Sequence, residues 1–247
     1  MDRLIWTAMS GMTDSMVRQR VIASNMANAQ TIGFRAETLY STPITLKGPQ
    51  LEARALSEGE VRGANLRPGS VVQTGRPLDV AVSGEAMLAL QATDGEEAYS
   101  RRGDLSISPT GVLQNGDGRP VIGNSGPITL PLGAAASIAP DGTVLVANPE
   151  APDQPAQPVD RIKLVSVTGS KIAKGLDGLF RVTGEGGALP TDEEARVETG
   201  SLEQSNVDPS EVMVEMISAQ RLFDIRTKMI ATARDVDESG ASLMRIS

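Results

Sequence analysis

The sequence of 247 residues contains no histidine and no cysteine. Without histidine it cannot form a Ser-His-Asp triad or a zinc site with histidine ligands. Without cysteine it has no thiol nucleophile, no cysteine-bound iron–sulfur cluster and no disulfide bond. These two absences exclude several large classes of enzyme and metalloprotein, and we predict neither a metal nor a cofactor.

Aromatic residues and long apolar runs are also scarce. The chain has one Trp, two Tyr and three Phe, so it offers no aromatic platform on which bases or sugars could stack. Its formal net charge of −8 repels nucleic acids and anionic lipids. No stretch approaches the roughly 18–20 apolar residues that cross a bilayer. We therefore expect neither nucleic-acid binding nor direct membrane insertion.

The N-terminal segment has the periodicity of a helix that packs along one side. Apolar residues recur there at steps of four and three residues, a repeat that is typical of a packed helical seam. Asn28, Gly33 and Phe34 interrupt the pattern, and Gly33 is a natural C-terminal stop. The seam consists of Ile5, Met9, Met12, Met16, Ala23 and Met26.

The C-terminal segment predicts a second, longer helix. Asp208 is a good N-cap, Pro209 suits the first turn, and Glu211 lies three residues after the cap. Apolar residues then follow two adjacent faces, which is more surface than one partner helix can cover. The seam contains Val212, Met216, Ala219, Phe223, Arg226, Ile230, Ala233 and Asp237, and the neighbouring stripe contains Leu222, Ile225, Met229 and Val236.

Between the two helices the hydrophobic period changes to two, as in half-buried strands. The alternating runs 78–82, 105–107 and 161–167 are separated by glycine-containing turns. We predict an α+β fold in which long N- and C-terminal helices pack as a coiled-coil-like pair, with a central antiparallel all-β domain. The predicted boundaries are 1–35 and 206–247 for a terminal helical assembly domain, 36–74 and 184–205 for a connecting region, and 75–183 for the central β domain.

The width of the C-terminal apolar surface favours assembly. Burial of each large apolar side chain contributes roughly 1.5–3 kcal/mol, whereas ordering each residue costs on the order of 1–2 kcal/mol of backbone entropy. We therefore expect both termini to be poorly ordered in the free chain and to fold against neighbouring subunits. The alternative is an intramolecular core, which is what such stripes form in most proteins. The predicted interface residues are Ile5, Met9, Met12, Met16, Met26, Val212, Met216, Leu222, Phe223, Ile225, Met229 and Ile230.

Several segments resemble the signatures of the flagellar rod and hook protein family. SNMANAQTIGFR at 24–35 resembles the Asn-rich helix end and Gly-Phe-Arg/Lys turn of that family. TGRPLDVAVSG at 74–84 and TGSLEQSNVD at 199–208 resemble two further motifs, in the family's order. The opening residues and modest length are most similar to proximal rod members, with distal rod members next. The motif residues are Asn25, Asn28, Gly33, Phe34, Gly75, Leu78, Asp79, Gly200, Leu202, Ser205 and Asn206.

This resemblance implies a structural, non-enzymatic subunit of the flagellar basal-body rod. Such a subunit would polymerise axially through its terminal helices, transmit torque, line the export channel and be needed for motility. Its implied partners are further copies of the chain, neighbouring rod proteins and the flagellar type III export apparatus. Its implied location is the periplasm-spanning rod, reached without a cleaved signal peptide. Asp2, Arg3 and Asp14 fit that last point, because they interrupt any apolar signal region.

Two other functions were weighed from the sequence. A wall hydrolase would need two carboxylates across a groove, and Glu96-Glu97 and 192–194 (Asp-Glu-Glu) are the available clusters. Both lie in turn-like contexts, which favours solvated surface. A secreted adhesin with helical ends and a β head is the other alternative. Arg226 and Asp237 on the C-terminal seam either face solvent or pair across subunits to fix axial register.

Overall fold

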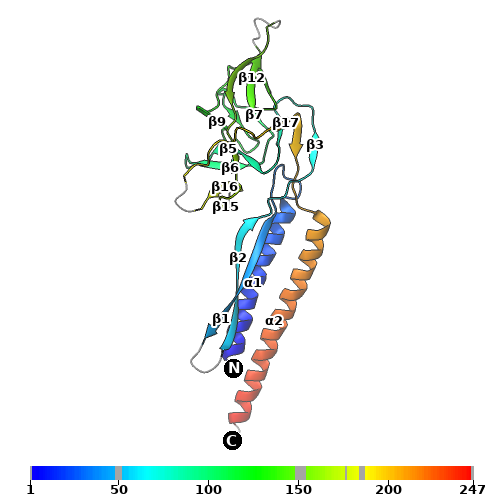
Figure 1. The fold of residues 1–247 in the computed structure, drawn as a ribbon. Helices are drawn as coiled ribbons and strands as arrows, with labels where there is room; N and C mark the ends of the chain where they lie inside the picture. Colours follow the sequence, from blue (N-terminus) through cyan, green and yellow to red (C-terminus); the bar gives the residue numbers. More distant parts are fainter. Residues whose placement is uncertain (1, 48–51, 148–153, 176, 184–186, 246–247) are drawn as a thin grey trace. The chain divides into compact units, whose positions relative to one another are not determined.

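The computed structural model describes residues 2–47, 52–147, 154–175, 177–183 and 187–245. Within that part of the chain it contains two helices and eighteen strands (Figure 1). These elements form two compact units. One, the terminal unit, holds α1, β1, most of β2 and α2, and the other, the β unit, holds Asn28–Ala36 and Ala64–Val207.

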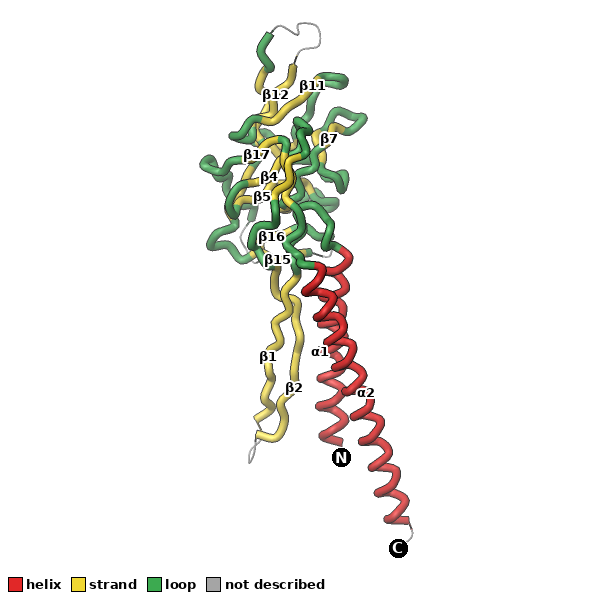
Figure 2. The backbone as a smooth tube through the Cα atoms, turned by 90° about the vertical axis from the view of Figure 1, so that its right-hand side faces the viewer, coloured by secondary structure: helices red, strands yellow, loops and turns green. Residues whose placement is uncertain are grey.

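The terminal unit combines two helices with one long hairpin. Helix α1 contacts both strand β1 and helix α2, and Figure 2 shows the helices and the hairpin as extended elements of this unit. Asn25 ties the last turn of α1 to the start of β1, because its amide donates to the Glu37 carbonyl at 3.1 Å and accepts from the Glu37 amide at 2.8 Å. The bounds are α1 Asp2–Ala27, β1 Glu37–Lys47, β2 Glu52–Ala64 and α2 Pro209–Arg245.

The start of α2 follows the predicted capping pattern. The Asp208 carboxylate accepts hydrogen bonds from the amides of Ser210 at 2.8 Å and Glu211 at 3.3 Å. Those amides have no partner inside the helix, so the cap satisfies donors that would otherwise be exposed. Helix α1 ends at Ala27, and Gly33 follows in a left-handed conformation with φ of 67°.

The prediction that the terminal helices pack as a coiled-coil-like pair is wrong. Such a pair requires apolar side chains of both helices to interlock along one seam. On α1, however, Met9 and Met16 are 56% and 55% exposed. The guanidinium of Arg226 on α2 instead donates to the Gly11 carbonyl and the Ser15 hydroxyl of α1. The contact between the helices therefore includes this polar pairing, and α1 also contacts β1.

The β1–β2 hairpin lies in the stretch 36–74, which had been assigned to a connecting region. Its sequence is polar and carries Gly59 and Gly63, so the alternation expected of a half-buried strand is weak. The domain boundaries given above stay a prediction. The central antiparallel β domain is present, within the β unit.

The β unit is built from short strands in several small sheets. The largest sheet has five strands in the order β14-β5-β6-β16-β15, and a second has the order β11-β12-β13. The other strands pair as β3 with β18, β4 with β17, β7 with β8 and β9 with β10. The bounds are β3 Val71–Gln73, β4 Val80–Val82, β5 Ala86–Gln91, β6 Glu97–Ser100, β7 Ser106–Ile107, β8 Leu113–Gln114, β9 Ile122–Gly123, β10 Gly126–Pro127, β11 Ala135–Ile138, β12 Thr143–Ala147, β13 Gln157–Arg161, β14 Leu164–Ser166, β15 Ile172–Lys174, β16 Phe180–Val182, β17 Val197–Thr199 and β18 Ser201–Glu203.

Strand β5 organises the core because both of its faces are buried. Leu88 and Leu90 point into the larger hydrophobic cluster, whereas Met87 and Ala89 point into the smaller one. This follows from the alternation of side chains along a strand. The larger cluster also contains Leu105, Leu113, Val144, Ile162 and Leu164, and the smaller one Tyr99, Val165, Phe180 and Leu189.

Tyr99 gives the smaller cluster a pH-dependent stability at alkaline pH. Its hydroxyl is buried and accepts a hydrogen bond from the Leu189 amide at 2.7 Å. Burial raises the pKa of Tyr99 from 10.0 to about 12, and the nearby Glu97 carboxylate adds to the increase. The stabilisation is therefore complete below pH 10 and is lost as the pH rises towards about 12, because the unfolded state ionises first.

We expect Tyr99→Phe to remove that loss. Between pH 10 and about 12 the unfolding free energy of the wild type should fall by up to about 2.7 kcal/mol relative to the variant. Urea denaturation of both proteins across this range measures the difference, and the titration of other groups cancels. Parallel curves for the two proteins would contradict the prediction.

Candidate assembly surface and polar junction

Helix α2 carries seven large apolar side chains that the described part of the chain leaves exposed. Leu222 is the least exposed of these residues at 36%, and Val214 the most exposed at 65%. Scattered apolar residues are normal on protein surfaces, but a contiguous apolar patch marks an interaction site. We call this set the α2 apolar face, and it comprises Met213, Val214, Ile217, Leu222, Ile225, Met229 and Val236.

The adjacent face of α2 carries the seam predicted from the sequence, and the chain itself partly covers this seam. Val212 and Ala219 are buried, at 6% exposure each. Met216, Phe223, Arg226, Ile230 and Ala233 are half-buried at the same helical spacing. The seam is therefore partly covered by the chain itself, and the stripe of Leu222, Ile225 and Met229 stays open to solvent.

The predicted interface residues of α1 divide in the same way. Met9 and Met16 are exposed, whereas Met12 and Met26 are half-buried. The side chain of Ile5 lies outside the described part of the structure, as does that of Asp237 on α2. Assignment of all these residues to an interface between subunits stays a prediction. Arg226 was expected either to face solvent or to pair across subunits. In the structure it contacts α1 of its own chain instead.

The family-motif residues gather mainly in the β unit. Several of them hold residues 33–36, which follow α1, and residues 201–206, which precede α2; we call these two stretches the connecting segments. Gly75 and Gly200 are bonded to each other through a backbone hydrogen bond of 3.0 Å, and the Gly200 amide donates to the Asp79 carbonyl at 2.8 Å. Asp79 is fully buried and accepts from the Thr74 hydroxyl at 2.7 Å. Leu78 packs against the larger cluster, Leu202 is buried, and Asn28 is bonded to Thr31.

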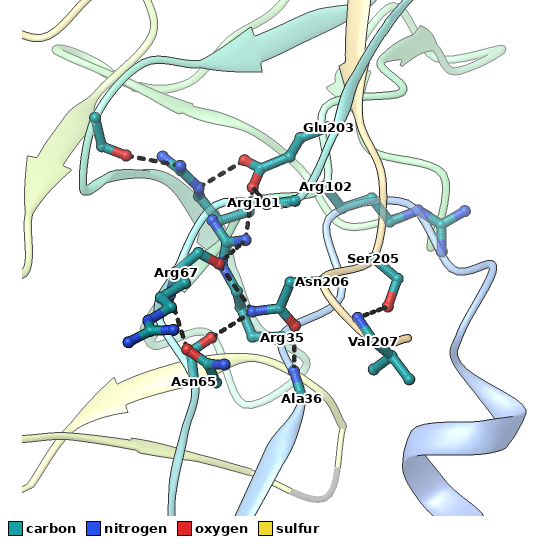
Figure 3. A network of polar contacts seen from close by, with 12 residues as sticks. Arg35, Ala36, Asn65, Arg67, Arg101, Arg102, Glu203, Ser205, Asn206 and Val207 are labelled. Atoms are coloured by element: carbon teal, nitrogen blue, oxygen red, sulfur yellow. Dashed lines mark hydrogen bonds and ion pairs between the residues drawn. The ribbon is translucent and has the colours of Figure 1, made fainter. Parts of the chain in front are cut away.

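Asn206 fixes the segment before α2 against the segment after α1. Its side-chain oxygen accepts from the Ala36 amide at 2.7 Å, and its side-chain nitrogen donates to the carbonyls of Asn65 at 2.7 Å and Arg67 at 2.8 Å. These contacts use three of its hydrogen-bonding positions. Ser205 accepts from the Val207 amide at 3.2 Å (Figure 3).

Beside Asn206 lies a buried ion triad, which together with Asn206 we call the polar junction. The Glu203 carboxylate is 2.6 Å from Nη1 of Arg35 and 2.9 Å from Nε of Arg101 (Figure 3). All three side chains are at most 2% exposed. Burial lowers the pKa of Arg101, the Glu203 charge opposes that change, and the Arg35 charge adds to it.

The triad was not predicted from the sequence, although Arg35 and Glu203 lie inside two of the quoted motifs. Arg101 comes from the segment after β6, so its pairing with residues about 66 and 102 positions away leaves no local pattern. Lys174 was also missed. Its ammonium lies 3.5 Å from the ring centroid of Phe34 and donates to the Arg35 carbonyl at 3.1 Å.

Two of the carboxylates considered for a hydrolase, those of Glu97 and Asp192, bond to other groups of the chain. Both oxygens of Glu97 accept from the Lys163 ammonium at 2.8 Å. Asp192 accepts from the backbone amides of Glu194 and Ala195. Among the described residues, no three or more acidic side chains are grouped as metal ligands, and neither helix is long and apolar enough to cross a bilayer.

Three family models match the chain in its N-terminal, central and C-terminal parts. They are described as flagella basal body rod protein at residues 5–35, flagellar hook protein FlgE/F/G D1 domain at 81–146, and flagellar basal body rod FlgEFG protein C-terminal at 198–243. The third match includes Glu203 and Asn206 of the polar junction and most of α2.

Curated relatives match over nearly the whole length. The chain is 42% identical to the flagellar basal-body rod protein FlgF of Escherichia coli K12 over 95% of both chains, and 40% identical to FlgF of Salmonella typhimurium over 100% of both. It is 28% identical to the rod protein FlgG of Bacillus subtilis over 98% of this chain and 99% of that protein. Since identity of 40–42% extends over full-length relatives, the chain belongs to the flagellar basal-body rod protein family.

Proposed function

We propose that this chain is a structural subunit of the flagellar basal-body rod that assembles axially through its terminal helices. It is a rod component located in the basal body, and not an enzyme, as its full-length relatives indicate. The observation that carries the axial assembly is the α2 apolar face, which stays exposed in the single chain. Apolar surface of this extent is stabilised when another chain covers it.

The partners follow from the same surface and from the family. Association with other rod proteins is implied by membership of the rod family. We further propose contacts between copies of this chain, made by the α2 apolar face together with Met9 and Met16 of α1. Head-to-tail contacts that do not close into a ring produce a helical filament, which is the symmetry of an axle. Such a tube would transmit torque and line the export channel, and the type III export apparatus would deliver the subunits.

The position along the rod is proposed from the identities. The FlgF relatives from two enteric bacteria are 40–42% identical to the chain, whereas the FlgG relative quoted above is 28% identical. This difference favours a proximal rod subunit, with a distal subunit as the alternative. Labelling of the tagged chain in purified basal bodies would place it in one half of the rod.

Co-purification with basal bodies tests the function. We expect deletion of the gene to abolish motility, and an epitope-tagged copy to restore it and to appear in detergent-extracted basal bodies. The tagged chain should resist a high-salt wash there, because apolar contacts are not screened by salt. A chain found only on the cell surface, with motility unchanged by the deletion, would favour the adhesin instead.

A further inference from the structure

The polar junction buries more positive than negative charge. Arg35 and Arg101 share the single carboxylate of Glu203, and all three side chains are removed from solvent. Arginine remains charged in proteins, so neither guanidinium can escape the cost of burial by losing a proton. Breaking a buried ion pair is far more costly than breaking an exposed one, because the remaining charge is left without compensation.

The three charges come from three separate parts of the chain. Arg35 belongs to the segment that follows α1, Glu203 ends β18 shortly before α2, and Arg101 follows β6 in the β unit. The two connecting segments also bond directly: the Gly33 amide donates to the Glu203 carbonyl at 2.8 Å and the Asn206 amide donates to the Phe34 carbonyl at 3.3 Å. Each segment therefore supplies hydrogen-bond partners to the other.

The two arginines differ in how strongly they depend on Glu203. Arg101 also donates to the carbonyls of Ala86 and Gly84, the latter at 2.7 Å, so the β unit holds it independently. Arg35 has only one such bond, which it donates to the Arg67 carbonyl at 2.8 Å. The Nε atoms of both arginines are buried without a hydrogen-bond partner of regular geometry in the described part of the chain, so the number of carbonyl bonds is what distinguishes the two side chains. Loss of the Glu203 charge should therefore release Arg35 first.

From this asymmetry we propose that the Arg35–Glu203–Arg101 triad is a latch that makes the docking of the two connecting segments interdependent. Lys174 also contacts Phe34 and the Arg35 carbonyl, but residues 33–36 keep their full set of native contacts only while residues 201–206 supply the Glu203 carboxylate. The segments that lead to α1 and to α2 therefore dock in one cooperative step. A chain with one of these segments undocked does not keep the other in its native place.

Hydrogen exchange of the full-length protein tests the latch. In Glu203→Gln the amides of Gly33 and Ala36 should exchange on the order of 100-fold faster than in the wild type, as expected from the loss of a buried ion pair. The Ala89 amide, which bonds to the Lys163 carbonyl inside the five-stranded sheet, should change less than about 3-fold. The matched control is Glu194→Gln, at an exposed glutamate that precedes strand β17 in the β unit, and it should leave all three amides unchanged.

A second variant separates the charge from the shape of residue 203. If unpaired charge drives the release, Glu203→Gln combined with Arg35→Met should restore the protection of Ala36 to within about 5-fold of the wild type, because the net charge buried in the triad returns to the wild-type value. If Glu203→Gln fails to fold, this double variant should fold. The proposal is overturned if Gly33 and Ala36 remain protected in Glu203→Gln, or if the double variant exchanges as fast as the single one.

Discussion

Replacing Ile225 and Met229 of α2 together by aspartate is expected to abolish incorporation of the chain into the rod. Both side chains are more than half exposed in the single chain, at 56% and 54%. Their burial against a neighbouring subunit would contribute about 1.5–3 kcal/mol each, and the substitution adds two charges that would have to be desolvated. Incorporation should therefore fall at least about 100-fold.

The fold of the monomer should be unaffected by this double substitution, because neither side chain is buried in it. Circular dichroism and urea denaturation of the purified variant check that point. The matched control is Gln220→Asp with Thr227→Asp, which adds the same charge at exposed positions outside both the seam and the α2 apolar face. Basal bodies carrying normal amounts of the Ile225/Met229 variant would show that this face is not the assembly surface.

Gly33→Ala, beside the polar junction, is expected to destabilise the β unit strongly. Gly33 has a φ of 67°, and a Cβ atom there would lie 2.4 Å from the carbonyl carbon of Arg101. The left-handed conformation costs an L-residue about 1–2 kcal/mol, and the overlap with main-chain atoms cannot be relieved by a rotamer change. We expect a loss of at least about 3 kcal/mol in the free energy of unfolding.

Gly75→Ala is the internal reference for that experiment. Gly75 has a φ of 73° but no atom within 4 Å of the position that a Cβ would take. It should therefore show only the backbone cost of about 1–2 kcal/mol. Urea denaturation of the two variants side by side separates conformational strain from steric overlap. Equal losses in the two variants would mean that the approach of Gly33 to Arg101 is unimportant.

The helices were the most predictable part of the chain, because their signals are local. The spacing of Val212, Met216, Ala219 and Phe223 predicts a helical seam, and Asp208 is the predicted N-cap of that helix. Period-two alternation likewise located the β domain, although individual strands proved short. The family motifs identified the family, since glycines and asparagines at fixed positions form a more specific pattern than hydrophobicity does.

What the sequence could not supply is the choice of partner for each surface. The 3.5-residue repeat of α1 was consistent with a helix pair, yet Met9 and Met16 are exposed and Arg226 inserts beside Gly11. Periodicity reports that one side of a helix is apolar, and it carries no information on what covers that side. The triad of Arg35, Arg101 and Glu203 was missed for a related reason, because pairing across such sequence distances depends on the assembled fold.

Helix α2 has 37 residues and α1 has 26, which corresponds to lengths of about 56 Å and 39 Å. Roughly three turns of α2 therefore have no counterpart in α1, and this overhang exists however the two helices are aligned. In the proposed stack of identical subunits, the molecule that arrives next can cover this overhang. We expect the last subunit of an unfinished stack to leave the extra turns of α2 uncovered. New subunits would then add preferentially at the growing tip.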